Sequence, residues 1–147
     1  MLQWKGSWAA STILLYYGKV GGIDASEPLY GHLHMVVMDY VDSTTVYNAQ
    51  KQNSLPEDFH EQVEAILSHL YGQGYVFGDL HSPNIMVMKS KKVMFIDFDW
   101  VGKDKESRYP IKMAQSITWP DSVRNGLGVM KQKHNKYMLD QLCSKKF

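Results

Sequence analysis

The sequence predicts a mixed α+β domain, because it combines one long amphipathic segment with several short apolar runs. Apolar residues recur with helical spacing between residues 54 and 74, whereas residues 85–96 hold two apolar runs on either side of a polar turn. The chain has 147 residues, enough to bury a core, and no repeat or linker divides it. We therefore expect one domain over residues 1–147.

The helix is expected between Ser54 and Gly74. Ser54 and Glu57 have the spacing of a capping box, and Pro56 suits the first turn, where its missing N–H costs little. Gly72 and Gly74 are expected to end the helix. One face should pack against the core, and its apolar residues are Phe59, Val63, Ile66, Leu67 and Leu70.

Shorter elements are expected on both sides of this helix. Ile13–Tyr17 and Tyr75–Phe77 read as short strands, and Met35–Met38 as a strand buried on both faces. The runs 85–88 and 93–96 read as a hairpin around the turn 89–92. A second helix is expected over roughly 133–143, with an apolar side made of Tyr137, Met138, Leu142 and Cys143.

The composition narrows the class of protein. Charge is balanced, with 16 Lys and Arg against 15 Asp and Glu, so neither nucleic acid nor an anionic membrane is expected as a partner. A lone cysteine, Cys143, excludes an internal disulfide and fits a reducing compartment. No early apolar run is long enough to span a bilayer, and the N-terminus lacks the pattern of a signal peptide. We expect an intracellular, cytoplasmic protein.

Three polar residues around the hairpin form the candidate site. Asp79 lies in the loop that enters the hairpin, Asn84 directly precedes its first strand, and Asp97 directly follows its second. Because the hairpin returns on itself, these side chains should meet at one end of it, where their oxygens would suit Mg²⁺ or Mn²⁺. Two could hold a metal ion while the third accepts a proton from an attacking hydroxyl, as phosphoryl transfer requires.

Each residue also has a simpler explanation. Asp and Asn are common turn formers, and an Asp at the end of an apolar strand often caps the next segment of the chain. Asp97 and Asp99 alone also resemble the metal-binding Asp-x-Asp of nucleotide-sugar transferases. The complete order of helix, strand, Gly-Asp loop, Asn, hairpin and Asp-Phe is much rarer than any of its parts.

The segment from Gly78 to Asp99 resembles the catalytic and magnesium loops of the protein-kinase-like superfamily, with the same order and spacing of Asp79, Asn84 and Asp97. The resemblance implies a protein-kinase-like fold, mainly its helical C-terminal lobe. It also implies that Asp79 is the catalytic base and that Asn84 and Asp97 are metal ligands. The stretch 96–110 is most similar to kinase-like proteins of basidiomycete fungi.

The same resemblance implies an ATP site. Met35–Val41 would be the last strand of the N-terminal lobe and the hinge, with Met38 as gatekeeper. The remaining adenine contacts would come from the backbone of Asp39 and Val41 and from an apolar floor of Met86 and Ile96.

The sequence departs from the protein-kinase pattern at several positions. Phe77-Gly78-Asp79 stands where protein kinases have His-Arg-Asp, and Asp99 replaces the Gly of Asp-Phe-Gly. Gly78 and His81 resemble the aminoglycoside and choline phosphotransferase branch instead. His81 either assists the phosphoryl group or holds the loop.

The expected domain is a truncated one, because no Gly-rich loop or lysine strand precedes Met35. Residues 1–41 would be the remnant of the N-terminal lobe with the hinge, and residues 42–147 the C-terminal lobe. The favoured function is Mg²⁺-dependent transfer of the ATP γ-phosphoryl group to a hydroxyl, impaired in this chain. An inactive kinase-like binding module and a small-molecule phosphotransferase stay open, as does the acceptor.

Overall fold

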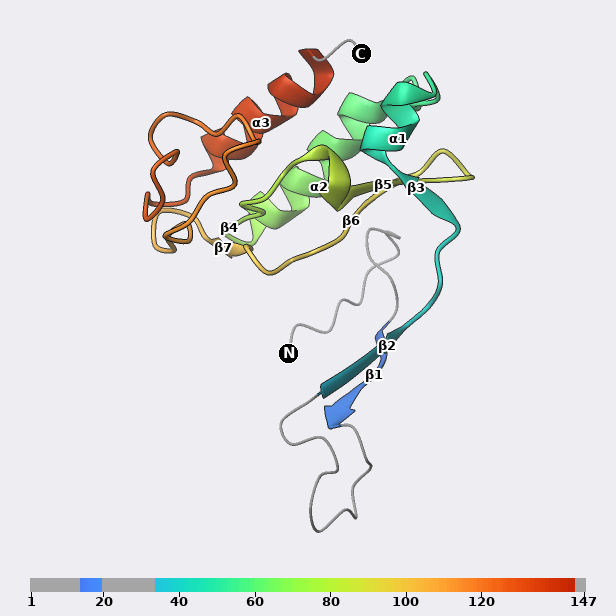
Figure 1. Ribbon diagram of the computed structural model, residues 1–147, viewed down its shortest axis with the longest axis horizontal. Helices are drawn as coiled ribbons and strands as arrows, with labels where there is room; N and C mark the ends of the chain where they lie inside the picture. The colour runs from blue at the N-terminus through green and yellow to red at the C-terminus, as the bar shows by residue number, and fades with distance from the viewer. Residues whose placement is uncertain (1–13, 20–33, 145–147) are drawn as a thin grey trace. The chain divides into compact units, whose positions relative to one another are not determined.

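The computed structural model describes residues 14–19 and 34–144, and the chain divides into two compact units, Met1–Asp42 and Ser43–Phe147. In the first unit, β1 (Leu14–Lys19) pairs antiparallel with β2 (His34–Met38) (Figure 1), with Tyr17 opposite Val36. Residues 14–17 are therefore in a strand as predicted, whereas Ile13 lies outside the described residues.

The burial predicted for Met35–Met38 is wrong. Every residue of β2 is exposed. Among the described residues of this unit, β1 is the one strand beside β2, and no position of β2 is buried as a covered face would require. The apolar run reflects strand propensity here, not a position between two layers.

The second unit is built on a three-stranded antiparallel sheet in the order β3-β5-β6. Its strands are β3 (Ser43–Thr45), β5 (Ile85–Met88) and β6 (Val93–Phe95). The predicted hairpin is confirmed, with Ile85 opposite Phe95 and Val87 opposite Val93. All four of these side chains are buried, so the register is fixed by the core.

Helix α2 (Phe59–Gly72) confirms the predicted apolar face but begins later than expected. Four residues of the face are buried and Ile66 is half-buried. The capping box is wrong: Asp58 is the N-cap residue, and the Ser54 hydroxyl donates to the carbonyl of Ala49. A short helix that the sequence reasoning missed, α1 (Val46–Lys51), supplies that carbonyl.

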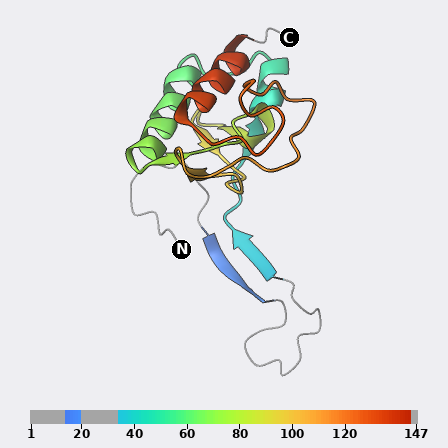
Figure 2. The same cartoon turned by 90° about the vertical axis from the view of Figure 1, so that its left-hand side faces the viewer.

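Helix α3 (Gln132–Ser144) lies beside α2 in both views (Figures 1 and 2). Its buried face differs from the predicted one, because Tyr137 and Cys143 are exposed. The buried residues are His134, Asn135, Met138, Leu139 and Leu142. The apolar pattern predicted the wrong face because two of the buried residues, His134 and Asn135 in the first turn, are polar.

The remaining elements join the sheet to the helices. β4 (Tyr75–Val76) pairs with β7 (Gly102–Lys103), and a single 3₁₀ turn, η1 (Ser82–Asn84), precedes β5. Residues 104–131 consist of turns, bends and irregular chain, with one isolated antiparallel bridge between Arg108 and Val129. Among the described residues, no helix combines the length and apolar character that crossing a bilayer requires.

His134 and Asp104 together cap the start of α3. The His134 Nδ1 accepts from the backbone N–H of Lys131 at 3.2 Å, and Asp104 Oδ1 accepts from that of Gln132 at 3.0 Å. The other ring nitrogen of His134, Nε2, lies 3.2 Å from the Ser122 hydroxyl. Two of the N–H groups that a helix start leaves unpaired therefore have partners.

Replacing Leu67 by Ala should lower the free energy of unfolding by about 2–4 kcal/mol, because the side chain is 2 % exposed and would leave a cavity. The neighbouring exposed Ser68 is the control, and Ser68→Ala should change stability by less than about 0.5 kcal/mol. Urea unfolding followed by circular dichroism measures both. Equal effects would contradict the assigned helix face.

Stability should fall as the pH drops below about 6.5, the ordinary pKa of histidine. Burial, together with Lys133 and Lys131 nearby, lowers the pKa of His134, although Asp104 opposes this. The unfolded chain therefore binds the proton more readily, and the contribution of neutral His134 is lost between pH 6.5 and its lower pKa. Urea midpoints between pH 5 and 8 should show a shallower decline in His134→Gln but not in a control, His69→Gln, at an exposed position.

Candidate active site

Gly78 fixes the direction in which the chain leaves β4. Its φ angle is +80°, a conformation that L side chains rarely adopt, and a Cβ at this position would collide with the carbonyl oxygen of Trp100. Its N–H donates to Asn135 Oδ1 of α3 at 3.4 Å. On either side, the side chains of Phe77 and Leu80 are fully buried. The loop that carries Asp79 is therefore anchored in the core.

Asp79 and Asn84 are joined side chain to side chain. Asn84 Nδ2 donates to Asp79 Oδ2 at 2.9 Å and to the Asp79 carbonyl at 3.2 Å. Asn84 is 7 % exposed in η1, and its backbone N–H donates to the carbonyl of His81 at 2.9 Å. Because the amide nitrogen makes these bonds, Asn84 Oδ1 is the atom left to act as a ligand.

His81 contacts Asp79. Its Nδ1 lies 2.9 Å from Asp79 Oδ1 and 3.1 Å from the Asp79 carbonyl oxygen. Burial by itself would lower the pKa of His81, but the hydrogen bond and charge of Asp79, with a smaller contribution from Asp97, outweigh it and raise the pKa. The imidazole is therefore held as a partner of the carboxylate, in the protonated form more readily than an exposed histidine would be.

Asp97 emerges at the same end of the hairpin as Asn84. The Ile85–Phe95 pair is the last of the ladder, and beyond it the Ile96 N–H donates to the Asn84 carbonyl at 3.0 Å. Asp97 follows with a φ of +59° and an exposed side chain. The structure thus brings Asp79, His81 and Asn84 into contact. Asp97 does not join these contacts, but the residue before it, Ile96, is hydrogen-bonded to the backbone of Asn84.

Phe98 packs the segment after β6 against the loop before η1. Its ring meets that of Phe77 edge-on at a centroid distance of 5.3 Å, and Phe77 in turn contacts Phe95 at 4.7 Å. Phe77 lies two residues before Asp79, and Phe98 directly follows Asp97. The contact between their rings therefore holds together the two chain segments that carry these aspartates.

The side chains present fit a magnesium ion as two oxygen donors, Asn84 Oδ1 and the Asp97 carboxylate. Mg²⁺ commonly takes one or two such protein ligands and completes its shell with phosphate and water oxygens. Within the described part of the chain, no three His, Cys, Asp or Glu side chains cluster closely enough to hold a metal by themselves.

The residues expected around adenine belong to different units. Met38 and Asp39 are exposed and Val41 is half-buried in the first unit. In the second unit, Met86 on β5 and Ile96 after β6 are half-buried.

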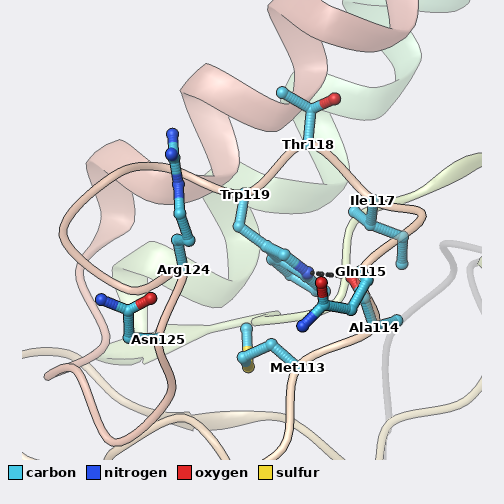
Figure 3. A pocket seen from close by; sticks show the side chains of 8 residues that line it. All are labelled: Met113, Ala114, Gln115, Ile117, Thr118, Trp119, Arg124 and Asn125. Carbon is cyan, nitrogen blue, oxygen red and sulfur yellow. Dashed lines mark hydrogen bonds between the residues drawn. The ribbon is translucent and has the colours of Figure 1, made fainter.

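A cavity of about 350 Å³ lies in the loop before α3, and Figure 3 shows its lining residues: Met113, Ala114, Gln115, Ile117, Thr118, Trp119, Arg124 and Asn125. Trp119 donates to the Ala114 carbonyl at 2.9 Å, as the dashed line marks, and Arg124 pairs with Asp121. The lining contains no carboxylate. The cavity is joined to the Asp79 loop only indirectly: Trp119 stacks on Trp100, whose carbonyl faces Gly78.

Two residues that act on the Asp79 loop were missed by sequence reasoning, Trp100 and Asn135. Trp100 acts through a backbone carbonyl, which leaves no signature in the sequence. Asn135 has a weak signature in the sequence, as half of a polar pair, His134-Asn135, inside an otherwise apolar helix face.

The model of the RIO domain family matches residues 18–108, more than half of the chain. The chain belongs to the RIO domain family. RIO domains are part of the protein-kinase-like superfamily, so the resemblance stated for residues Gly78 to Asp99 is confirmed at that level. The narrower likeness to fungal proteins has no support. At family level, the RIO domain is an atypical kinase-like, ATP-binding phosphotransferase domain that typically uses Mg²⁺. No curated protein matches the chain.

Gly78→Ala should lower the free energy of unfolding by about 2–4 kcal/mol, because the new Cβ would combine a positive φ with a clash against backbone. Gly72 provides the control: it ends α2, and a Cβ there meets nothing within 4 Å. Gly72→Ala should be neutral or stabilising by up to about 1 kcal/mol. Thermal unfolding of both variants measures the difference, and a Gly78→Ala protein as stable as the native chain would refute the constraint.

Proposed function

We propose that this RIO domain transfers the γ-phosphoryl group of ATP to a hydroxyl in a Mg²⁺-dependent reaction, with Asp79 as base and Asn84 and Asp97 as metal ligands. The observation that carries the proposal is the direct Asn84–Asp79 hydrogen bond next to Asp97 at one end of the hairpin. One amide bonds the proposed base through Nδ2 and leaves Oδ1 for the metal. This direct bond between the proposed base and one proposed metal ligand supports the assignment.

In the proposed step, the acceptor oxygen attacks the γ-phosphorus, the bond from that phosphorus to the bridging oxygen of ADP breaks, and the hydroxyl proton passes to Asp79. The metal ion would neutralise charge on the phosphate oxygens. The protein's own part is to orient Asp79, through Asn84 on Oδ2 and His81 on Oδ1. We assign His81 the role of holding the loop, because both of its ring contacts go to Asp79.

Adenine would bind as in other kinase-like proteins. Met38 would be the gatekeeper, and the backbone of Asp39 and Val41 would pair with the base. Its apolar floor would be Met86 and Ile96, which are half-buried beside the hairpin end that carries Asn84. In this assignment the first unit belongs to the N-terminal lobe with the hinge and the second to the C-terminal lobe.

The small-molecule phosphotransferase alternative rests on Gly78 and His81, and both have local structural explanations. Gly78 is required by its φ angle and by the Trp100 carbonyl, and His81 pairs with Asp79. Neither residue therefore favours a small-molecule acceptor over a protein hydroxyl.

Three variants test the proposal. Asp97→Ala should abolish the broadening that Mn²⁺ with ADP causes in the NMR signals of the Asn84 side-chain amide. Asp79→Asn should retain this broadening but reduce γ-phosphoryl transfer by about 10²–10⁴-fold, the usual contribution of a positioned base. Asp99→Asn changes an exposed carboxylate in the same loop and should alter neither.

Two results would contradict the proposal. Equal broadening in Asp97→Ala would remove the metal role of that residue. A native chain that shows neither metal–nucleotide binding nor transfer would favour the binding-module alternative instead.

A further inference from the structure

Leu127 is an exposed apolar residue in a backbone conformation that leucine rarely adopts. Its φ angle is +56°, and 51 % of its surface is exposed. The other described non-glycine residues with positive φ are all polar: Asn53, Lys91, Asp97 and Lys105. An apolar side chain gains little from burial here, and it adds steric cost to a turn that glycine or asparagine would make more easily. Such outliers gather where a protein binds something.

Hydrogen bonds and close approach of the backbone hold Leu127 in this conformation. Its N–H donates to the Pro110 carbonyl at 3.2 Å, and its own carbonyl accepts from Arg108 Nη1 at 2.8 Å. Glycines stand on both sides, because a Cβ at Gly126 or at Gly128 would collide with a backbone carbonyl oxygen. The backbone at Leu127 is therefore fixed, while its side chain is left exposed.

Ile111 extends the apolar surface. It is 68 % exposed and directly follows Pro110, whose carbonyl bonds Leu127. The two segments run antiparallel at this point, with a bridge between Arg108 and Val129. The two exposed side chains therefore lie in one region of the surface. Single exposed apolar residues are ordinary, but here the backbone that carries one of them is strained in doing so.

The charge around this apolar pair is positive. Residues 107–131 hold four basic residues and one acidic residue, whereas the whole chain has 16 basic and 15 acidic residues. The acidic residue, Asp121, pairs with Arg124. Within the part of the chain that the structure describes, no carboxylate pairs with Arg108 or Lys112. A partner that carries carboxylates beside an apolar side chain would complement both features.

We propose that Leu127 and Ile111, bordered by Arg108 and Lys112, form a docking surface for an acidic segment of another protein that carries an apolar side chain. A nucleic acid would neutralise the basic side chains but leave the two apolar ones uncovered. The surface uses no residue of the proposed reaction, so the inference stands apart from the proposed function.

The first test selects ligands that need Leu127. A library of random peptides displayed on phage is depleted on the Leu127→Gly variant and then selected on the native chain. The enriched peptides should combine several Asp or Glu residues with an aliphatic or aromatic one. Enrichment of basic or uncharged peptides, or no enrichment at all, would overturn the proposal.

The second test separates docking from folding, with one enriched peptide labelled for fluorescence anisotropy. Leu127→Gly should weaken its binding by about tenfold or more, the effect expected of a central apolar contact. The Tm of this variant should be unchanged or higher, because glycine adopts a positive φ without strain. A lower Tm would show that the leucine serves the fold, and either a lower Tm or unchanged affinity would overturn the proposal.

Asn53→Gly is the matched control for this variant. Asn53 is exposed and also has a positive φ, of +48°, but it lies after α1 and outside the proposed surface. The substitution should leave the affinity for the peptide unchanged. An equal loss of affinity in Asn53→Gly would overturn the proposal.

The third test concerns charge. Lys112→Gln should weaken peptide binding by about threefold at low salt, the usual effect of one exposed charge, and by less as salt is added. Lys136→Gln removes an exposed lysine of α3 and should change nothing. Equal affinities of Lys112→Gln and the native chain at low salt would overturn the proposal.

Two other occupants are tested directly. An excess of single-stranded RNA should not displace the labelled peptide, and sedimentation velocity should show the same species for the native chain and Leu127→Gly. Displacement by RNA would assign the surface to nucleic acid. A native dimer that Leu127→Gly dissociates would assign it to a second copy of the chain, and either result would overturn the proposal.

Discussion

The register of the β5–β6 hairpin is the constraint on which the candidate site depends. Ile85 and Phe95 are paired at the last position of its ladder, and each residue is at most 1 % exposed. A slip of one residue would turn each of these side chains toward the opposite face, so the core enforces the register. Asn84 and Asp97 leave the ladder at this end, which means that their spacing is set by packing and not by any interaction between them.

The loop that carries Asp79 depends on the same core through aromatic contacts. Phe77 is fully buried and touches Phe95 of the hairpin and Phe98 beyond it. Gly78 then turns the chain under the Trp100 carbonyl. Apolar packing therefore positions both sides of the site, and the hydrogen bonds between Asp79, His81 and Asn84 only have to adjust side chains already brought together.

Sequence reasoning succeeded where a pattern was long and local. The helical face of α2 spans three turns, and the hairpin is a continuous segment, so neither depended on knowing the rest of the fold. The Asp79–Asn84 contact was foreseeable for the same reason, because a short loop joins the two residues. The start of α2 was missed since Ser54 bonds Ala49 of α1, a helix too short to show periodicity.

Sequence reasoning failed where the environment of a residue is formed by residues far from it in the sequence. Tyr137 and Cys143 have apolar character, but the buried stripe of α3 includes His134 and Asn135 instead, whose partners are a serine, a backbone N–H and Gly78. β2 has the composition of a covered strand, and its described surroundings cover neither face. Local propensity cannot report either fact, because both depend on which segments meet in three dimensions.

The start of α3 connects stability to the site. His134 caps the helix, and the next residue, Asn135, reaches Gly78. A change that frays this first turn would therefore act on the Asp79 loop as well as on the helix. Both are buried polar side chains, and their hydrogen bonds offset the cost of burying them. The backbone segment that Asn135 contacts is the one that presents the carboxylate of Asp79.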